Sequence, residues 1–475
     1  MVTTAVFLGF ALGVLLFFSP GSLAFIFLAI IIILLINKIS DEKERGFIKT
    51  IFMLGLGARI FFVLITMGWA IFNNNILNYA WRSCPDYGTP YIIDDSGYYT
   101  LRGLFTNMHW LGMPLSAYTI NAVVRNSYGF SGFIYVLAFY FMLFGYSPVS
   151  SRFINCFLAS VTSILIYYIT KSMFGKKAGQ LAAIITAFFP SLFLWSITNL
   201  KESSFIFSIY LMFWSIHQFK ATRKFYHFIT IVLAMASQFF IRSGYKEFLY
   251  ITVVVVLFDS LFLLLLNLYT KKRVFNLLII FMALFLIISL NRDKMSMVVE
   301  DIKRKSLTQH RGALSEGGIC YQLLPDEQLY KLNISNAVFL QMLGNGWIHM
   351  MLEPFPWRFQ SKPMLLGLFQ MVLWYGLLFF AFSGIGILVR YKAKESMIFI
   401  SYFFIIVSAL AVMGGNIGTT FRFRDIITPL ILMFSSVGLI NAFGRTEQCS
   451  EVLNNNARID AQKDYKTQDK VIFNV

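Results

Sequence analysis

Two adjacent carboxylates, Asp94 and Asp95, are the residues of this chain that point most directly to chemistry. They follow a long apolar run and are followed at once by Ser-Gly-Tyr98-Tyr99. A carboxylate within reach of a hydroxyl can act as a general base, and two carboxylates in one loop can bind Mg²⁺ or Mn²⁺. The alternative is a helix cap, because an acid at a helix start satisfies backbone N–H groups and complements the helix dipole. The pair alone leaves these interpretations open.

Composition defines the setting of this acid pair. Of 475 residues, 57% are hydrophobic and only 13% are charged. Many apolar runs approach or reach the roughly 18 to 20 residues that a helix needs to cross a hydrocarbon core of about 30 Å. We therefore predict an all-α polytopic membrane protein with about twelve transmembrane helices. The predicted spans are 4–18, 21–37, 50–73, 152–170, 179–198, 203–219, 226–241, 247–269, 274–290, 364–389, 396–413 and 425–443.

One further apolar run, Gly129–Phe144, decides the topology, because counting it as a crossing would reverse the side of every later loop. Lys and Arg mark cytoplasmic loops. Four short tracts hold three basic residues each, while the intervening short loops hold fewer: Lys201, Arg242 with Lys246, and Arg422 with Arg424. The tracts are Lys171/Lys176/Lys177, Lys220/Arg223/Lys224, Lys271/Lys272/Arg273 and Arg390/Lys392/Lys394. These tracts and the charged loop after residue 37 are all cytoplasmic only if Gly129–Phe144 does not cross.

The topology gives a domain organisation with two long outer segments. We expect residues 74–150 to form an outer catalytic loop with juxtamembrane or re-entrant helices, a placement that helical or protein-covered backbone tolerates. The full division is 1–73, an N-terminal transmembrane hairpin and first core helix; 74–150; 151–290, a transmembrane core; 291–363, a second outer loop; 364–444, C-terminal transmembrane helices; and 445–475, a cytoplasmic tail. Cys84 and Cys320 are both predicted outside, so their pairing is open.

Several function classes find no support in the sequence. The net charge of +17 comes mostly from the short tracts between apolar runs, which is typical of cytoplasmic loops and head-group contact, so we expect no nucleic-acid partner. Four Cys without a CxxC spacing and five scattered His give no metal-thiolate or redox pattern. The Gly-rich stretches Gly344–Gly346 and Gly414–Gly418 do not connect a strand to a helix, which argues against a nucleotide cradle.

The order of motifs after the acid pair resembles a known superfamily. An amphipathic helix follows the pair, then come Gly132–Pro148, Ser151-Arg-Phe-Ile-Asn155, the Phe174–Lys177 turn and Phe189–Glu202. This succession resembles the GT-C superfamily of membrane glycosyltransferases, especially the branch related to protein mannosyltransferases and lipid A aminoarabinose transferases. The resemblance covers roughly residues 50–220, with weaker agreement near 414–440.

The resemblance implies a site and a reaction. In that superfamily an acid pair in the first outer loop, separated by two residues from a following Tyr, supplies the catalytic carboxylate, and Asp94, Asp95 and Tyr98 match it. Glu202 is the counterpart of a second acid that is common after the Trp195-containing span. The implied donor is a sugar on a polyprenyl phosphate, and the implied place is the outer or periplasmic side of the plasma (inner) membrane. A divalent metal is an open alternative, with Asp94 and Asp95 as its ligands.

Basic residues on the outer side are candidates for the departing phosphate. Negative charge grows on that phosphate in the transition state, and Arg binds phosphate oxygens at two points. We expect substrate contacts from Tyr98, Arg102, Lys201, Arg242, Lys246, Arg358, Arg422 and Arg424. The alternative for each cation is lipid head-group contact or a neighbouring acid.

Three functions are compatible with these residues. The first is a glycosyltransferase that acts on a glycan, lipid or protein. The second is a flippase of lipid-linked polysaccharide, which would need charges in the middle of its spans, and few are present. The third is a polysaccharide polymerase or ligase. The acid pair favours the first.

Overall fold

A computed structural model gives the structure, and it describes residues 20–72, 94–124, 131–242, 292–315, 319–331, 333–358 and 362–443. Apart from an isolated bridge between Cys320 and Asn416, the elements in these ranges are helices. They are α2 (Gly21–Asn37), α3 (Glu42–Phe72), α5 (Asp94–Trp110), α6 (Ala117–Thr119), η1 (Ile120–Val124), α7 (Phe133–Phe144), α8 (Pro148–Phe174), α9 (Lys176–Phe188), α10 (Pro190–Ser196), α11 (Glu202–Thr222), α12 (Phe225–Ile241), α15 (Arg292–Ser315), α16 (Asp326–Leu329), α17 (Asn336–Leu352), η2 (Pro356–Arg358), α18 (Lys362–Tyr391), α19 (Ala393–Ala411), α20 (Ile417–Arg424) and α21 (Thr428–Phe443). The predicted all-α fold is confirmed for these ranges.

The membrane-spanning character of the bundle is clear from helix length and composition. Within the described ranges, α3, α8 and α18 contain segments long and apolar enough to cross a membrane. The number becomes five if the bent pairs α9 with α10 and α20 with α21 each count as one span. The chain is thus an α-helical multi-pass membrane protein. The predicted spans 4–18, 247–269 and 274–290 and the tail 445–475 lie outside the described residues, so the number of twelve stays a prediction.

Close backbone contact between α18 and α21 builds the main core. A Cβ added at Gly384 would lie 2.0 Å from the Phe434 carbonyl oxygen, and one at Gly438 would lie 2.0 Å from that of Phe380. Small residues at facing positions allow this approach, as they do in membrane helix pairs generally. The largest cluster of buried apolar side chains includes residues of α11, α18, α19 and α21. This cluster fixes the ends of α11 and of the α20–α21 pair.

The predicted span 179–198 is two helices, α9 and α10, bent by 55°. Pro190 is the first residue of α10, and its missing N–H interrupts the helical hydrogen-bond ladder. Buried Asp425 holds α10 to the corner between α20 and α21, because it accepts hydrogen bonds from Ser191 Oγ (2.7 Å) and Trp195 Nε1 (2.5 Å). The bend therefore gives the turn that follows α10 a defined position.

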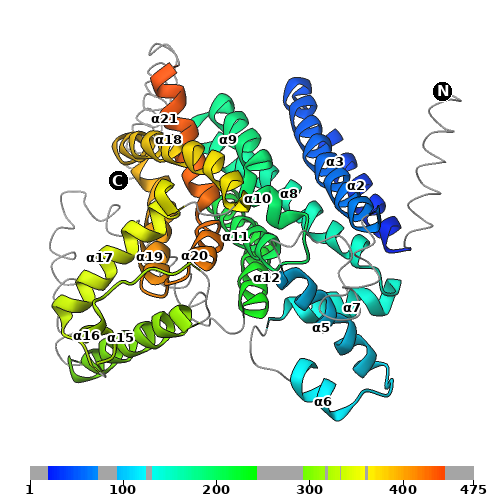
Figure 1. Cartoon of the computed structure of the whole chain (residues 1–475). Coiled ribbons are helices and arrows are strands. Elements are labelled where there is room, and N and C mark those ends of the chain that lie inside the picture. Colours follow the sequence, from blue (N-terminus) through cyan, green and yellow to red (C-terminus); the bar gives the residue numbers. More distant parts are fainter. Residues whose placement is uncertain are drawn as a thin grey trace, which may run out of the picture.

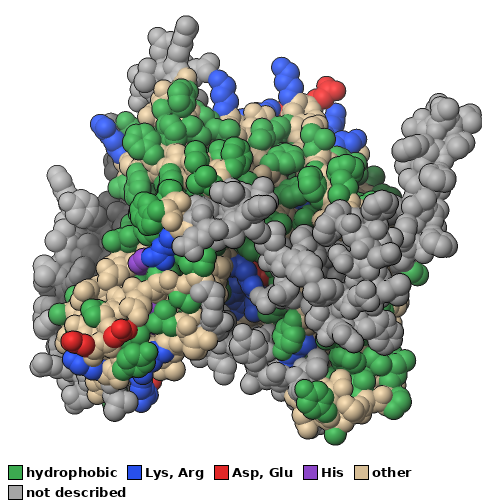
Figure 2. Space-filling view, viewed as in Figure 1, with side chains coloured by type: hydrophobic (Ala, Val, Ile, Leu, Met, Phe, Trp, Pro, Cys, Tyr) green, Lys and Arg blue, Asp and Glu red, His purple; other side chains and the backbone are tan. Residues whose placement is uncertain are grey.

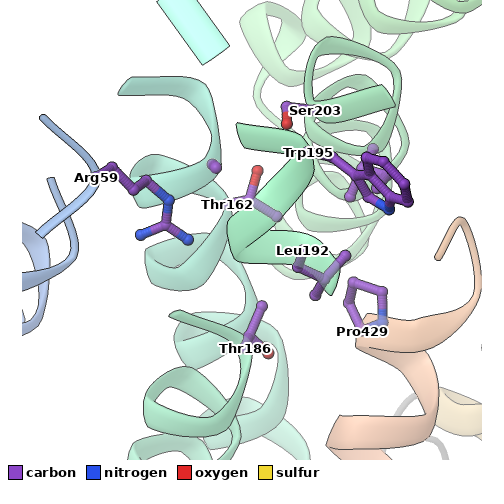
Figure 3. Close-up of a pocket in the computed structure, with 9 residues that line it drawn as sticks. Arg59, Thr162, Thr186, Leu192, Trp195, Ser203 and Pro429 are labelled. Carbon is purple, nitrogen blue, oxygen red and sulfur yellow. The ribbon is translucent and has the colours of Figure 1, made fainter. Parts of the chain in front are cut away.

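Arg59, within α3, ties that helix to the bend. Its side chain is buried; Nε donates to Ser196 Oγ (2.7 Å), Nη1 to the Gly55 carbonyl (2.9 Å) and Nη2 to the Ala187 carbonyl (2.8 Å). Figure 3 shows the guanidinium pointing from α3 toward Thr162, beside a cavity of about 20 Å³. A cavity of this size has room for about one water molecule and is too small for a sugar or a phosphate. The bend therefore positions the chain but does not hold substrate.

The two segments that are predicted to be outer gather at one end of the bundle. Figure 1 shows α5, α6 and α7 at the lower right and α15 and α16 at the lower left, while α2, α3, α9 and α21 extend toward the upper end. Helix α7 has 12 residues, which is about 18 Å of helix and less than a hydrocarbon core of about 30 Å. It packs on α5. That Gly129–Phe144 does not cross stays a prediction.

Ion pairs join the turns at the opposite end. Lys171 Nζ lies 2.6 Å from Glu44 Oε2, and Lys176 Nζ lies 2.7 Å from Asp41 Oδ2. The hydrogen bond from Lys176 holds the pKa of Asp41 below its ordinary value. These contacts join the α2–α3 turn to the α8–α9 turn, and both turns are predicted to be cytoplasmic. Basic side chains are visible along this upper end in Figure 2.

Candidate active site

The N-terminus of α5 is held against the turn between α10 and α11. Helix α5 begins at Asp94, so both acids are in its first turn, while their side chains lie outside the described residues. Ser96 comes next and is fully buried, and its Oγ accepts a hydrogen bond of 2.9 Å from the backbone N–H of Asn199. The start of α5 is therefore in direct contact with the segment that leads into Glu202.

Asn199 connects three elements through its side chain. Its Nδ2 donates to Thr100 Oγ1 on α5 and to Ser151 Oγ on α8, both at 2.9 Å. All three side chains are fully buried. Since a buried polar network stays ordered when its hydrogen bonds are made, Asn199 fixes α5 relative to α8.

Asn155, one turn further along α8, holds the same turn from its other side. Its Nδ2 donates to the carbonyl oxygens of Thr198 (2.7 Å) and Leu200 (2.6 Å). Its Oδ1 accepts from Ser204 Oγ at 3.0 Å. The side chain thus satisfies carbonyl groups of an irregular segment, which buried backbone requires. The turn is rigidly positioned as it enters α11.

Glu202, the first residue of α11, brings two arginines together. Its Oε1 lies 3.0 Å from Arg422 Nε on α20 and 3.4 Å from Arg242 Nη2 after α12. The side chains of Glu202 and Arg242 are 1% and 0% exposed, whereas that of Arg422 is 20% exposed. The Arg242 guanidinium also lies between the rings of Phe205 (4.8 Å) and Phe423 (5.0 Å). Arg422 is therefore the more accessible cation of this cluster.

Further predicted residues belong to the same region. Lys201 Nζ lies 5.3 Å from the centre of the Tyr99 ring on α5. Arg102 Nη1 lies 3.3 Å from the Tyr98 hydroxyl, and its guanidinium carbon lies 5.3 Å from that ring. Figure 2 shows basic side chains in a recess between the two lower lobes of the molecule. The described positions thus combine the α5 start with Lys201, Glu202 and two arginines.

Arg424 is directed away from this cluster, although it is two residues from Arg422. Residues two apart on a helix point about 200° apart, so they face different neighbours. Arg424 is 1% exposed, lies over the Trp374 ring at 4.6 Å and donates to the Glu353 carbonyl at 2.6 Å. Arg358 lies 3.4 Å from Glu353 Oε1. Arg424 and Arg358 therefore stabilise a second group around Glu353, and their predicted phosphate contacts stay predictions.

The second outer segment docks on the loop before α20. The backbone N–H of Tyr321 donates to the Gly415 carbonyl at 2.8 Å, and that of Ile417 donates to Ile319 at 3.0 Å. The Tyr321 hydroxyl lies 2.6 Å from Thr420 Oγ1. Burial raises the pKa of Tyr321 to about 12, so it stays a neutral partner. These contacts position the helix that carries Arg422.

His310, on α15, stabilises the same contact between the two segments. The side chain is fully buried; Nδ1 contacts the Gly414 carbonyl and Nε2 lies 3.2 Å from the Leu323 backbone N–H. The contacts assign a neutral ring in which Nδ1 donates and Nε2 accepts. Burial lowers the pKa of His310, the hydrogen bond with the Gly414 carbonyl opposes this shift, and nearby His349 adds to it.

Some predicted site residues lie outside the described part of the chain. Lys246 is one, and the carboxyl groups of Asp94 and Asp95 are others. The metal prediction rests on those two carboxyl groups and stays a prediction. Among the described residues, no three His, Cys, Asp or Glu side chains are grouped as a metal site, and Glu202 is neutralised by arginines. Cys84 also lies outside, so the question of its pairing with Cys320 stays open.

Several residues that shape the site were not predicted as site residues: Asn155, Asn199, Ser96, Asp425 and Arg59. Arg59 could have been noticed, because an ionisable residue inside an apolar run marks a position that must be paired. The partners of the others are distant in the chain, and no sequence pattern indicates them.

Comparison with known proteins identifies a domain within this architecture. Residues 132–292 match the model of the dolichyl-phosphate-mannose-protein mannosyltransferase family, which is a GT-C superfamily domain. The match begins at α7 and includes the α10–α11 turn, Glu202 and Arg242. The curated proteins contain no match to the chain.

Proposed function

Because residues 132–292 carry a GT-C domain of membrane glycosyltransferases that use a lipid-linked sugar donor, we propose that this protein moves a sugar from a polyprenyl-phosphate donor to an acceptor on the outer side of the plasma membrane. The acceptor is a glycan, a lipid or a protein. The active site is proposed at the end of the bundle where α5, α11 and α20 meet.

The observation that carries this proposal is the contact between Ser96 and Asn199. It joins the start of α5, where the acid pair lies, to the turn that leads into Lys201 and Glu202. Proton transfer needs a carboxylate, and a departing phosphate needs cations. Segments that are about a hundred residues apart in the sequence are thereby combined into one region with both types of group.

The proposed reaction assigns a role to each group. The acceptor hydroxyl oxygen bonds to the anomeric carbon while the bond from that carbon to the phosphate oxygen breaks. The hydroxyl proton passes to a carboxylate of the acid pair, and the polyprenyl phosphate leaves with the electron pair. Arg422, with Lys201, neutralises the charge that grows on the phosphate. Glu202 and Arg242 position Arg422, and Tyr98 and Arg102 line the acceptor side of the acid pair.

The alternative flippase function is less well supported by the described residues. A lipid-linked polysaccharide that crosses the bundle would need mid-span charges along its path. Arg59 is such a charge, but its hydrogen bonds go to Ser196, Gly55 and Ala187 and stabilise the α9–α10 bend. A polymerase or ligase would use the same outer site, and only its acceptor would differ.

The test is transfer activity of acid-pair variants. Mass spectrometry of cell-envelope glycans from cells with and without the gene identifies the product, and transfer is then measured in membranes. We expect Asp94→Asn or Asp95→Asn to reduce transfer by about 10²-fold or more, since general base catalysis contributes that much. The matched control is Asp301→Asn, which should retain activity. Asp301 is a partly exposed aspartate in the second segment that is predicted to be outer, and it pairs with Arg304 and Lys305. Normal transfer by both acid-pair variants would exclude their catalytic role.

A further inference from the structure

A second cavity lies between α11 and α19, away from the candidate active site. Its volume is about 320 Å³, at the lower end of the range of about 300–1,000 Å³ for small-molecule sites. It is lined by Phe213, Ile216, His217, Lys220, Ala221, Glu395, Ile398 and Phe399. Neither the sequence prediction nor the proposed reaction uses it.

The cavity lies at the other end of α11 from Glu202. His217 and Lys220 follow Glu202 by 15 and 18 residues, and a helix rises about 1.5 Å per residue, so about 22 to 27 Å separate them along the axis. This is nearly the thickness of a hydrocarbon core. The tract Lys220/Arg223/Lys224 marks this end as cytoplasmic by the positive-inside rule. The cavity is thus independent of the donor site.

The lining changes from apolar to charged. Phe213 and Phe399 are 1% and 2% exposed, and their ring centres are 5.0 Å apart, so they form an apolar floor together with Ile216 and Ile398. The polar residues come from the last turns of α11 and the first turn of α19: His217, Lys220 and Glu395. An apolar floor beside ionisable groups suits an amphiphile better than a soluble polar molecule.

The lining carries one positive charge on Lys220 and one negative charge on Glu395, and further basic residues adjoin the lining helices in the sequence. Exposed Arg223 and Lys224 follow α11, and Arg390 with Lys392 precedes α19. Basic pockets between membrane helices on the cytoplasmic side bind lipid head groups with phosphate. We propose that this cavity binds the head group of an anionic phospholipid of the cytoplasmic leaflet. Lys220 contacts the phosphate, and the first methylene groups of the acyl chain pack against Phe213 and Phe399.

The test measures thermal unfolding of the purified protein in detergent. A ligand that binds the folded state raises the unfolding temperature. We expect phosphatidylglycerol to raise it more than phosphatidylcholine does. In Lys220→Glu, most of the difference between the two lipids should be lost. In Ala221→Trp the difference should be lost too, because a bulky side chain fills the cavity. Ala221 is exposed, so this substitution does not disturb the core. Glu395→Gln should increase it.

The control variant is Lys38→Glu, which makes the same charge change at an exposed position after α2. It should keep the response to phosphatidylglycerol. An equal loss in this variant would indicate general surface attraction and overturn the proposal. So would an unchanged response in both Lys220→Glu and Ala221→Trp. Inorganic phosphate is added separately, and an equal rise with it alone would identify a soluble phosphate site and overturn the lipid proposal.

Discussion

A single carboxylate, Glu202, brings together two cations of the candidate site, Arg242 after α12 and Arg422 on α20. Its Oε1 pairs with Arg242 and Arg422, yet the two arginines differ in exposure, at 0% and 20% of the side chain. A buried charge depends on its partner far more than an exposed one does. Arg242 is therefore expected to depend on Glu202 for stability, while Arg422 is better placed to exchange part of this contact for a substrate phosphate.

This difference predicts that two substitutions act mainly on different properties, stability and donor binding. Glu202→Gln should lower the free energy of unfolding by about 3 kcal/mol, because it removes the negative charge beside the buried Arg242 guanidinium. Arg422→Gln leaves the buried Glu202 carboxylate paired with Arg242, so it should cost less, about 1 to 2 kcal/mol, but raise the apparent KM for the lipid-linked donor. Thermal unfolding in one detergent and transfer rates at a series of donor concentrations measure the two effects.

A double variant provides the control. Arg242→Met replaces the buried cation with an apolar chain of similar length, so Glu202→Gln with Arg242→Met should be more stable than Glu202→Gln alone. If Glu202→Gln unfolds at the wild-type temperature, the buried pair does not contribute to stability and the expectation fails.

Among the elements, the apolar runs predicted helices well and their interruptions less well. Runs 203–219 and 364–389 are α11 and α18, each longer than its run because polar residues at membrane surfaces continue the helix. Run 179–198 is bent at Pro190, a residue whose missing N–H is visible in the sequence. Run 425–443 begins at the corner after α20, where Asp425 accepts bonds from α10. That corner depends on a partner more than two hundred residues away.

The candidate site was predictable only in its parts. The acid pair, Lys201 and the outer arginines could be named from residue type and loop charge, and Glu202 from the resemblance to the GT-C superfamily. Their arrangement could not, because Asn199 meets Ser96 and Thr100 across about a hundred residues of chain. Arg422 and Arg424 point in different directions because of helix geometry, but predicting this requires knowing that both lie on one helix.

Docking of the second outer segment predicts a pH effect. His310 on α15 needs a neutral ring to accept from Leu323, and burial lowers its pKa below the ordinary value of 6.5. As the pH falls below about 6.5, His310 binds a proton in the unfolded chain before it does so in the folded chain. The stability that neutral His310 contributes is therefore fully present above that pH and is lost as the pH falls through the lower pKa of the folded state. We expect the thermal unfolding temperature to fall between about pH 7 and 5.

The variant His310→Gln separates this residue from other titrating groups. A glutamine amide can donate and accept one hydrogen bond each, as the neutral imidazole does, but it does not titrate. The variant should therefore show a smaller fall in unfolding temperature over the same pH range. An identical pH dependence in wild type and variant would assign the effect to other groups.

Across the whole molecule, the two ends differ in how charge is used. At one end Lys171 and Lys176 pair with acids of the α2–α3 turn, and further basic tracts remain near the surface. At the other end Glu202, Arg242 and Arg424 are buried among helices. This asymmetry fits a cytoplasmic face that contacts lipid head groups and an outer face that holds a reaction site.

The asymmetry predicts which positions an impermeant thiol reagent reaches in intact cells. Thr222→Cys lies at the basic end of α11 and should be labelled only after the membrane is opened, whereas Tyr330→Cys, at a position 73% exposed in the second outer segment, should be labelled in intact cells. The parent protein carries replacements of Cys84, Cys320 and Cys449, while Cys156 is buried and is retained. Its transfer activity is measured first, and activity at the wild-type level is the criterion that these replacements are tolerated. Labelling of Thr222→Cys in intact cells would reverse the sidedness and move the proposed reaction to the cytoplasmic face, because Glu202 lies at the opposite end of the same helix.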